Sequence, residues 1–396
     1  MSDLLWHSNA PWSSTGYGQQ TGINAPLIAE KYNLTLSSFY GLEGAPLQWK
    51  GIKVLPGMGG EFGNLSLIPH ATHVFDGDPR GGLVVTLMDV WVLDAAVCAE
   101  LNMGCWVPID HDPCPPAVNR FFDQSGAVPI AMSKFGRDQL ERFDPLYVPH
   151  GIDTGTYRPR GRTEIRKAWG LDDDAFVVGI CAANKGRPSR KAFSESLQAL
   201  KPFMDAHENV YLYLHTTIDP GFAQGEDLNK IMDALEIPRD RVGASSQYAA
   251  TLNPYPPEMM AMIYSGMDVL LNPAHGEGFG ITPLEAQACG VPAIVQDFTA
   301  MTEVTGAGWH VGGRKIWTGQ NSWQRSPNVE EIHDALEECY HLTQAERDAL
   351  SAKAREHALE YSHTKVFDEY WVPVLASLED RFQQEAPITI APRVAA

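Results

Sequence analysis

The sequence is poor in positive charge. Its 30 lysines and arginines stand against 49 aspartates and glutamates, which gives a net charge of −19 at neutral pH. Such a surface repels the phosphates of nucleic acids and the anionic headgroups of membranes, so both are poor candidate partners. The chain can bind a small anion only where positive groups gather locally. Any basic cluster in this sequence therefore stands out.

Closely spaced cysteines and long apolar runs are also missing. The six cysteines are spread along the chain with no Cys-x-x-Cys pair, and this predicts neither a disulfide framework nor a structural zinc site. The first residues lack the basic start and apolar stretch of a signal peptide, and no apolar run is long enough to span a bilayer. We therefore expect a reduced, cytoplasmic protein.

Short apolar segments alternate with amphipathic ones along most of the sequence. Strand-like segments lie at 3–8, 34–40, 82–89, 104–110, 127–133, 175–183, 210–216, 267–274 and 291–297, and helix-like segments at 19–32, 134–143, 192–206, 225–237, 256–266 and 328–342. Strands separated by helices are typical of parallel sheets. Glycine, proline and charge gather at 150–162. The pattern predicts two Rossmann-like α/β domains with doubly wound parallel sheets, at residues 1–152 and 153–362.

The end of the chain and the position of a ligand site follow from this organisation. A last helix is expected at residues 363–382, crossing back to the N-terminal domain. The proline- and alanine-rich segment 383–396 is expected to be disordered. Ligands of doubly wound sheets bind at the carboxyl ends of the strands, so two such domains would share one central cleft.

The segment 275–290, HGEGFGITPLEAQACG, places two glutamates around a glycine-rich turn after a predicted strand. Glycine lets the backbone approach a ligand closely, and the first amides of the following helix form an anion site. Glu277 lies in the turn, facing the position of a ligand. Glu285 has a structural alternative, because Thr282-x-x-Glu285 has the form of a capping box.

A basic loop follows the strand-like segment 175–183. Lys185, Arg187, Arg190 and Lys191 place four positive charges within seven residues of an acidic chain. Arginine with lysine would neutralise a diphosphate through charge-assisted hydrogen bonds. The alternative is an ordinary solvated loop. The basic loop lies at a strand end, in the same domain as Glu277. This position favours a phosphate-binding site over a solvated loop.

Two further segments carry weaker signals. The loop at 13–22 has Gly16-x-Gly18, but its next glycine is Gly22, one position late for a dinucleotide-binding fingerprint. His111 stands between Asp110 and Asp112 at the end of a predicted strand, which makes it a candidate cleft residue. No second histidine at ligand spacing supports a metal site there.

Taken in order, these segments resemble the GT-B retaining glycosyltransferases of family four, the glycosyl transferases group 1 type. Residues 276–304, GEGFGITPLEAQACGVPAIVQDFTAMTEV, are similar to the signature of that family, in which seven residues separate two glutamates. AMSKFGRDQL at 131–140, VPHGIDTGTYRP at 148–159 and HDPCPP at 111–116 resemble other segments of its members.

The resemblance implies a role for each candidate residue. Glu277 would contact the hydroxyls of the donor sugar, His111 would lie near its reacting carbon, and Lys191 would hold the diphosphate; these are the expected catalytic residues. Glu285 would bind the ribose. The other expected donor-binding residues are Gly16, Tyr17, Gly18, Arg187, Arg190, Gly278, Phe279, Gly280 and Ile281. The Gly-Arg-Leu that usually precedes the lysine is absent, so either Arg187 or Arg190 is its partner.

The resemblance also implies an activity. The protein would move a hexosyl group from a UDP- or GDP-sugar to an acceptor hydroxyl, with retention of anomeric configuration. No metal and no covalently bound cofactor is expected, because basic side chains and helix-end amides would neutralise the leaving phosphate. The acceptor is expected to be soluble: a protein, a glycan or a small metabolite.

Other functions compete with this interpretation. A sugar-nucleotide epimerase or a phosphorylase would share the fold but not the reaction. A non-catalytic protein that binds nucleotide sugars or carbohydrates would share the fold and the binding site. A nicotinamide-dependent oxidoreductase is supported only by the imperfect glycine pattern at residues 16–22.

Overall fold

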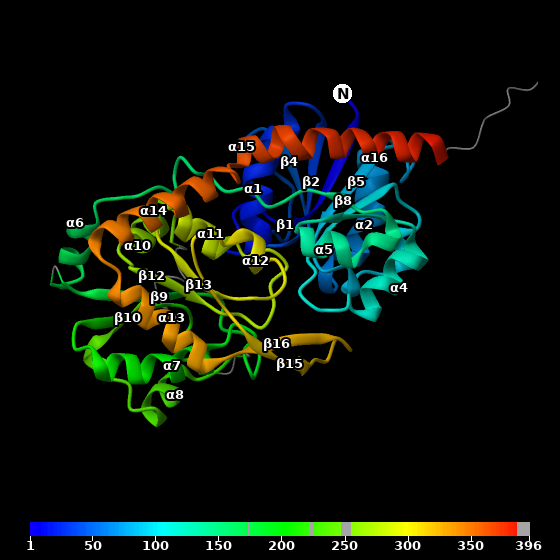
Figure 1. Ribbon diagram of the computed structural model, residues 1–396. Coiled ribbons are helices and arrows are strands. Elements are labelled where there is room, and N and C mark those ends of the chain that lie inside the picture. The colour runs from blue at the N-terminus through cyan, green and yellow to red at the C-terminus, as the bar shows by residue number, and fades with distance from the viewer. Residues whose placement is uncertain (173, 222–224, 247–254, 386–396) are drawn as a thin grey trace, which may run out of the picture.

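The computed structural model describes residues 1–172, 174–221, 225–246 and 255–385. Two α/β units lie side by side, and each is built on its own sheet (Figure 1). Among the described residues, no helix has both the length and the apolar character needed to cross a membrane.

The first unit is built on an eight-stranded sheet in the order β3-β4-β2-β1-β5-β6-β7-β8. Every neighbouring pair is parallel except β3 and β4. The strands are β1 (Asp3–Asn9), β2 (Asn33–Tyr40), β3 (Leu47–Trp49), β4 (Ile52–Pro56), β5 (Leu83–Leu87), β6 (Met103–Val107), β7 (Val128–Ala131) and β8 (Leu146–Tyr147). Its helices are α1 (Gly16–Ala29), α2 (Asn64–Val74), α3 (Ala95–Cys98), α4 (Pro116–Ser125) and α5 (Lys134–Gln139).

The second unit is built on a six-stranded, wholly parallel sheet in the order β11-β10-β9-β12-β13-β14. The strands are β9 (Phe176–Cys181), β10 (Val210–His215), β11 (Val242–Ala244), β12 (Val269–Asn272), β13 (Ala293–Gln296) and β14 (Gly308–Val311). Its helices are α6 (Arg162–Ala168), α7 (Phe193–Ala206), α8 (Leu228–Ala234), α10 (Pro257–Ser265), α11 (Ile281–Ala288), α12 (Met301–Val304), α13 (Val329–His341) and α14 (Gln344–Leu359). The predicted fold class, two Rossmann-like parallel-sheet domains, is confirmed.

Helices cover both faces of the second sheet. Phe176 and Val178 of β9 pack in one apolar cluster with residues of α7 and α13, whereas Val177 packs in another with residues of α10 and α11. All six residues of β9 are therefore buried. A strand buried on both faces reads as a continuous apolar run, which is why the sequence FVVGIC predicts it so clearly.

The predicted glycine loop at residues 13–22 is largely helical, so this prediction was wrong. Helix α1 begins at Gly16, and the hydroxyl of the N-cap Thr15 accepts a hydrogen bond from the Gly18 amide at 3.0 Å. A Cβ atom at Gly18 would come within 2.4 Å of the Ser13 carbonyl oxygen. Gly18 therefore lets the helix pack on the preceding loop, a role that needs no nucleotide.

The chain passes between the two units twice at one place. Ile152 pairs with Ser362: the Ile152 amide donates to the Tyr361 carbonyl and the His363 amide to the Ile152 carbonyl, both at 2.9 Å. After the second passage come α15 (His363–Val366), the π-helical turn Phe367–Trp371 and α16 (Val372–Glu385). Figure 1 shows α16, in red, lying along the first unit.

Helix α16 is anchored in the first unit by packing and polar contacts. The Trp371 ring lies 5.4 Å from that of Trp6 and 4.8 Å from that of Trp106, measured between centroids. Tyr32 donates a hydrogen bond to Glu379 at 3.2 Å. The helix continues through Glu385, three residues past its expected end at residue 382, and residues 386–396 lie outside the described residues.

We predict that Trp371→Ala destabilises the protein strongly. Trp371 has no exposed surface and fills space between two other buried tryptophans, so its removal leaves a cavity that costs about 3–5 kcal/mol of the free energy of unfolding. Urea unfolding monitored by circular dichroism measures this cost. As a matched control, Trp317→Ala at a site that is 56% exposed should change stability by less than about 1 kcal/mol. Equal costs for the two variants would contradict the prediction.

Candidate active site

The loops at the carboxyl ends of the strands in the two units meet in one contact region, which we call the junction. A Cβ atom at Gly276, in the turn after β12, would come within 2.2 Å of the Asp110 carbonyl oxygen, in the loop after β6. One at Gly278 would come within 2.3 Å of Pro108 Cβ. These two glycines therefore set how closely the units approach.

Glu277 is the anionic centre of the junction. Its carboxylate is 9% exposed and accepts hydrogen bonds from the Lys191 ammonium and, at 3.1 Å, from Arg190 Nη1. Burial alone would raise the pKa of Glu277, but the two cations lower it to about 2. Glu277 is thus ionised at physiological pH, so it accepts hydrogen bonds and does not act as a proton donor.

The two cations come from the loop between β9 and α7, as the basic cluster in the sequence suggests. Arg190 also donates to the Gly276 carbonyl at 2.7 Å. Burial lowers the pKa of Lys191, while the Glu277 charge opposes that shift. Arg187 points elsewhere, because its Nε donates to the Gly225 carbonyl. Arg190, rather than Arg187, is the arginine that the structure places beside Lys191.

The capping-box alternative for Glu285 is wrong. Helix α11 begins at Ile281 with Gly280 as its N-cap, so Thr282 lies inside the first turn. The Thr282 hydroxyl accepts a hydrogen bond from Asn272 Nδ2 at 2.9 Å instead. Gly280 has a φ of 108°, which a residue with a side chain rarely adopts, and this lets the turn enter the helix without a side-chain cap.

Glu285 connects the two units. Its Oε1 accepts a hydrogen bond from Gln19 Nε2 of α1 at 2.5 Å, and its Oε2 accepts one from Tyr264 Oη at 2.9 Å. Tyr157 donates a further hydrogen bond. Burial raises the pKa of Glu285 despite these donors, since none of the three is a cation. Glu285 is held by neutral donors, whereas Glu277 is held by charges.

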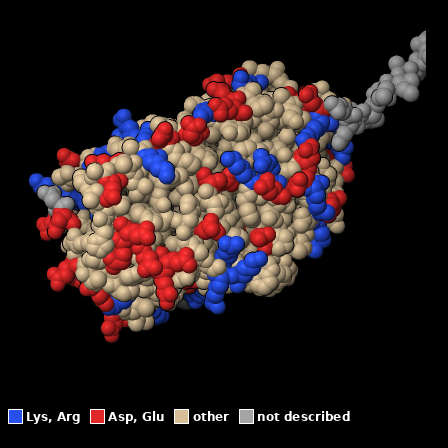
Figure 2. All heavy atoms as spheres, in the orientation of Figure 1, with Lys and Arg blue, Asp and Glu red and all other residues tan. Residues whose placement is uncertain are grey.

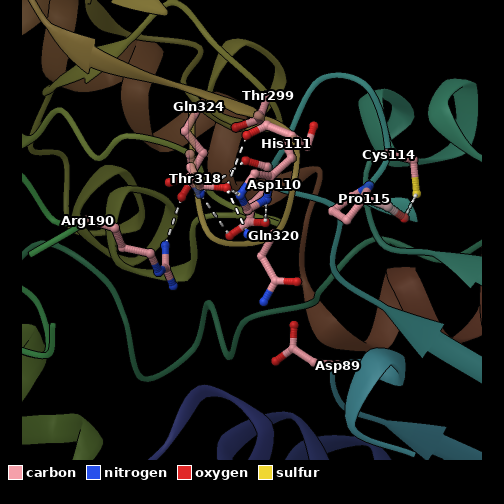
Figure 3. A network of polar contacts seen from close by, with 12 residues as sticks. Asp89, Asp110, His111, Cys114, Pro115, Arg190, Thr299, Thr318, Gln320 and Gln324 are labelled. Atoms are coloured by element: carbon pink, nitrogen blue, oxygen red, sulfur yellow. Dashed lines mark hydrogen bonds and ion pairs between the residues drawn. The ribbon is translucent and has the colours of Figure 1, made fainter. Parts of the chain in front are cut away.

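His111 is buried at the junction and has a fixed orientation. Its Nδ1 lies 2.6 Å from Asp110 Oδ1, so Nδ1 carries the ring proton and donates it to the carboxylate. Its Nε2 lies 2.9 Å from Thr318 Oγ1 (Figure 3). Asp110 therefore positions the imidazole and keeps the lone pair of Nε2 toward the second unit.

Thr318 belongs to a hairpin that the sequence does not predict. Strands β15 (Gly313–Trp317) and β16 (Trp323–Pro327) form an antiparallel two-stranded sheet. Strand β16 also bridges to the first unit, where the Asp112 amide donates a hydrogen bond to the Trp323 carbonyl at 3.0 Å. Ser322, in the turn of the hairpin, donates a hydrogen bond to the Pro113 carbonyl. Gln324 Nε2 of β16 lies 3.4 Å from Asp110 Oδ2. Most residues of β15 are exposed on both faces, so the hairpin lacks the apolar alternation that would have indicated it.

The start of α1 brings more side chains to the junction. Gly16 faces Ile281 of α11, since a Cβ atom there would lie 3.3 Å from Ile281 Cδ1. Tyr17 donates a hydrogen bond to Asp89 Oδ2 at 3.1 Å. Burial, followed by the nearby charge of Asp110, raises the pKa of Asp89. Asp89 was missed in the sequence, where its position at the end of the strand-like segment 82–89 was the available signal.

The remaining predicted residues lie in the glycine turn and at the start of α11. The Phe279 ring is buried and packs edge-on against His150, with centroids 5.0 Å apart, so only its main chain can meet a ligand. The first amides of α11 have no acceptor within the helix. They point out of its N-terminus at Ile281, next to Gly278 and Gly280. A helix N-terminus is where an anion binds, so the anion site that the glycine turn predicts stays a prediction at this position.

Comparison with solved structures identifies the fold as GT-B. Sucrose-phosphate synthase from Thermosynechococcus elongatus superposes with a TM-score of 0.70 at 15% identity, covering 96% of this chain and 98% of that one. The Anabaena protein Alr3699/HepE in complex with UDP-glucose gives a TM-score of 0.67 at 15% identity, covering 95% and 100%. Residues 251–357, which include both glutamates, match the model of the family described as Glycosyl transferases group 1.

Curated relatives match parts of the chain. The D-inositol 3-phosphate glycosyltransferase of Geodermatophilus obscurus is 27% identical over 243 residues, which is 59% of this chain and 48% of the relative. The lipopolysaccharide core biosynthesis mannosyltransferase LpsB of Rhizobium meliloti is 32% identical over 165 residues, covering 41% and 44%. The match thus spans less than half the length of each of these relatives.

We predict that Glu285→Gln stabilises the protein at neutral pH. A raised pKa means that folding favours the protonated carboxyl, so the stability associated with Glu285 is greatest below its unfolded pKa of about 4.3 and is lost as the pH rises through the folded value. A glutamine at this position cannot ionise, so the variant does not lose this stability as the pH rises. The melting temperature of the variant should exceed that of the wild type by more at pH 7 than at pH 4. The exposed Glu258→Gln is the control, and a Glu285→Gln variant that melts lower at pH 7 would refute this account.

Proposed function

We propose that the protein is a glycosyltransferase that moves a hexosyl group from a nucleotide diphosphate sugar to an acceptor hydroxyl. The observation that carries this proposal is the convergence of Lys191 and Arg190 on Glu277, beside the N-terminus of α11. The two cations outnumber the one carboxylate that they contact, in a protein whose overall charge is −19. A diphosphate is the anion that such a cluster suits best.

Each group then has a task in donor binding. Lys191, Arg190 and the first amides of α11 hold the diphosphate, and Glu277 accepts hydrogen bonds from hydroxyls of the sugar. Glu285 accepts hydrogen bonds from the ribose, in place of the one that it receives from Gln19. The base is that of UDP or GDP: a relative from Mycobacterium tuberculosis, 29% identical over 180 residues, is named as a GDP-mannose-dependent mannosyltransferase, and a structural neighbour was solved in complex with UDP.

The reaction follows from where charge develops. When the bond between the sugar and the diphosphate breaks, negative charge appears on the leaving phosphate and positive character on the sugar. Lys191 and Arg190 are already in place to stabilise the phosphate, so no metal ion is required. His111, oriented by Asp110, lies beside the reacting carbon. The departing phosphate takes the proton of the acceptor hydroxyl on the same face, which gives retention.

The acceptor lies on the side of the first unit, where Asp89 and Tyr17 face the donor site. The Asp89 carboxyl orients the acceptor hydroxyl. The net charge of −19 disfavours an anionic membrane. We therefore expect a soluble acceptor, such as a protein, glycan or small metabolite, in a cytoplasmic setting.

The donor site is tested by thermal stability against UDP, GDP, ADP, dTDP, their sugars and NAD. A ligand at about 100 times its dissociation constant adds about 2.7 kcal/mol, enough to raise the melting temperature measurably. We expect one nucleoside diphosphate to stabilise the protein, and Lys191→Ala to weaken its binding about ten- to hundredfold, since a charge-assisted hydrogen bond contributes about 1.5–3 kcal/mol.

Arg190→Ala should weaken binding more than Arg187→Ala, because only Arg190 reaches Glu277. Lys230→Ala is the control: this lysine is 84% exposed and pairs with a residue of its own helix cap. Stabilisation by NAD and by no nucleoside diphosphate would reject the donor site and favour an oxidoreductase.

The anomeric configuration is tested by NMR of the product, with the donor that the binding panel identifies. Retention predicts the same anomeric form in product and donor, and an inverted product would refute the mechanism. Loss of donor without an acceptor, accompanied by an isomeric nucleotide sugar, would identify an epimerase instead. Tight donor binding with no turnover over a panel of acceptors would identify a carbohydrate-binding protein.

A further inference from the structure

A second cluster of polar side chains lies at the far ends of two helices from the junction. His207 caps the C-terminus of α7, and Glu337 and His341 are on the last turns of α13. Helix α7 begins two residues after Lys191, and its 14 residues span roughly 20 Å. The cluster is thus separate from the proposed donor site.

The side-chain atoms of this cluster have the spacing of metal ligands. His207 Nε2 lies 2.9 Å and His341 Nε2 3.5 Å from Glu337 Oε2, and one ligand atom from each residue lies within 4.8 Å of the others. Four ligands at about 2.0–2.2 Å around a tetrahedral zinc ion are about 3.3–3.6 Å apart. Small side-chain rotations therefore suffice to place an ion between the three residues.

The sequence of α13 keeps these groups on one side. His333, Glu337 and His341 are spaced by four residues, so they share one face of the helix. His333 Nε2 lies 3.7 Å from Glu337 Oε1 and is a fourth candidate ligand. The His207 ring is held against Tyr340, with centroids 4.0 Å apart, which restricts its rotation.

The electrostatic setting favours a cation. Helix α13 also carries Glu330, Glu331, Asp334 and Glu338, and Figure 2 shows acidic side chains gathered over this part of the second unit. Imidazole nitrogens with a single carboxylate suit zinc, cobalt, nickel or copper, whereas magnesium and calcium prefer sites made of oxygen ligands. The chemistry thus selects a transition metal.

We propose that His207, Glu337 and His341, with His333 beside them, bind one divalent transition-metal ion, with zinc as the expected occupant. The ion joins the C-terminal ends of α7 and α13. At the N-terminal end of α7, Glu195 already contacts His275 and Ser326, both at 3.1 Å, and Ser326 lies three residues before α13. A metal ion would therefore fix the second end of a helix pair whose first end supports the junction. The role is structural and separate from the sugar-transfer reaction.

The test is titration of the tag-free full-length protein with Co²⁺, followed by visible absorption. We expect saturable binding of one ion per chain with the intense absorption of tetrahedral cobalt, displacement by Zn²⁺, and a higher melting temperature with Zn²⁺. The His341→Ala and Glu337→Gln variants should bind at least tenfold more weakly. His341 is 69% exposed, so its removal leaves the fold intact, and an unchanged melting temperature without metal verifies this.

His310→Ala is the matched control, since His310 is an exposed histidine on β14, outside the cluster. It should bind cobalt as the wild type does. Absence of saturable binding by the wild type would overturn the proposal, and so would equal affinities for the wild type, His341→Ala and Glu337→Gln. Anomalous diffraction from zinc-soaked crystals should give a peak between the three residues, and a peak elsewhere would also refute the site.

Discussion

The ion pairs of Glu277 with Lys191 and Arg190 are the interaction on which the junction depends. A buried carboxylate without a cation is costly, so the turn after β12 requires the loop after β9 beside it. That neighbourhood exists because β9 and β12 are adjacent parallel strands whose carboxyl ends meet at one edge of the sheet. Chain topology, local charge and the position of the α11 N-terminus therefore support one another.

Two glutamates eight residues apart have opposite electrostatic environments. Cations hold Glu277 ionised, whereas neutral donors and burial favour the protonated form of Glu285. The difference arises from what packs against each side chain: Glu277 faces the basic loop of its own unit, and Glu285 faces tyrosines and Gln19 of α1. The proposed donor carries both a charged diphosphate and an uncharged ribose, and such a division would suit both.

Much of the fold and part of the junction could be predicted from the sequence. Buried parallel strands such as FVVGIC are continuous apolar runs, and residues that follow such strands converge in space, which is how Glu277 and Lys191 were found. Contacts between distant segments carry no comparable signal. The Gln19–Glu285 hydrogen bond and the hairpin contact of Thr318 with His111 depend on how the two units meet, and local pattern does not record this. The predicted capping box was wrong because the left-handed Gly280, rather than Thr282, is the N-cap, so α11 starts two residues earlier than predicted.

The position of Trp371 has a consequence for how the protein is made. This residue completes a cluster with Trp6 and Trp106, although more than 260 residues separate it from either in the chain. A ribosome delivers the N-terminal strands first, yet the apolar face that Trp371 covers stays uncovered until the second unit has also been synthesised. The first unit therefore cannot complete its core until Trp371 has been synthesised. During that interval the nascent chain exposes apolar surface that chaperones bind.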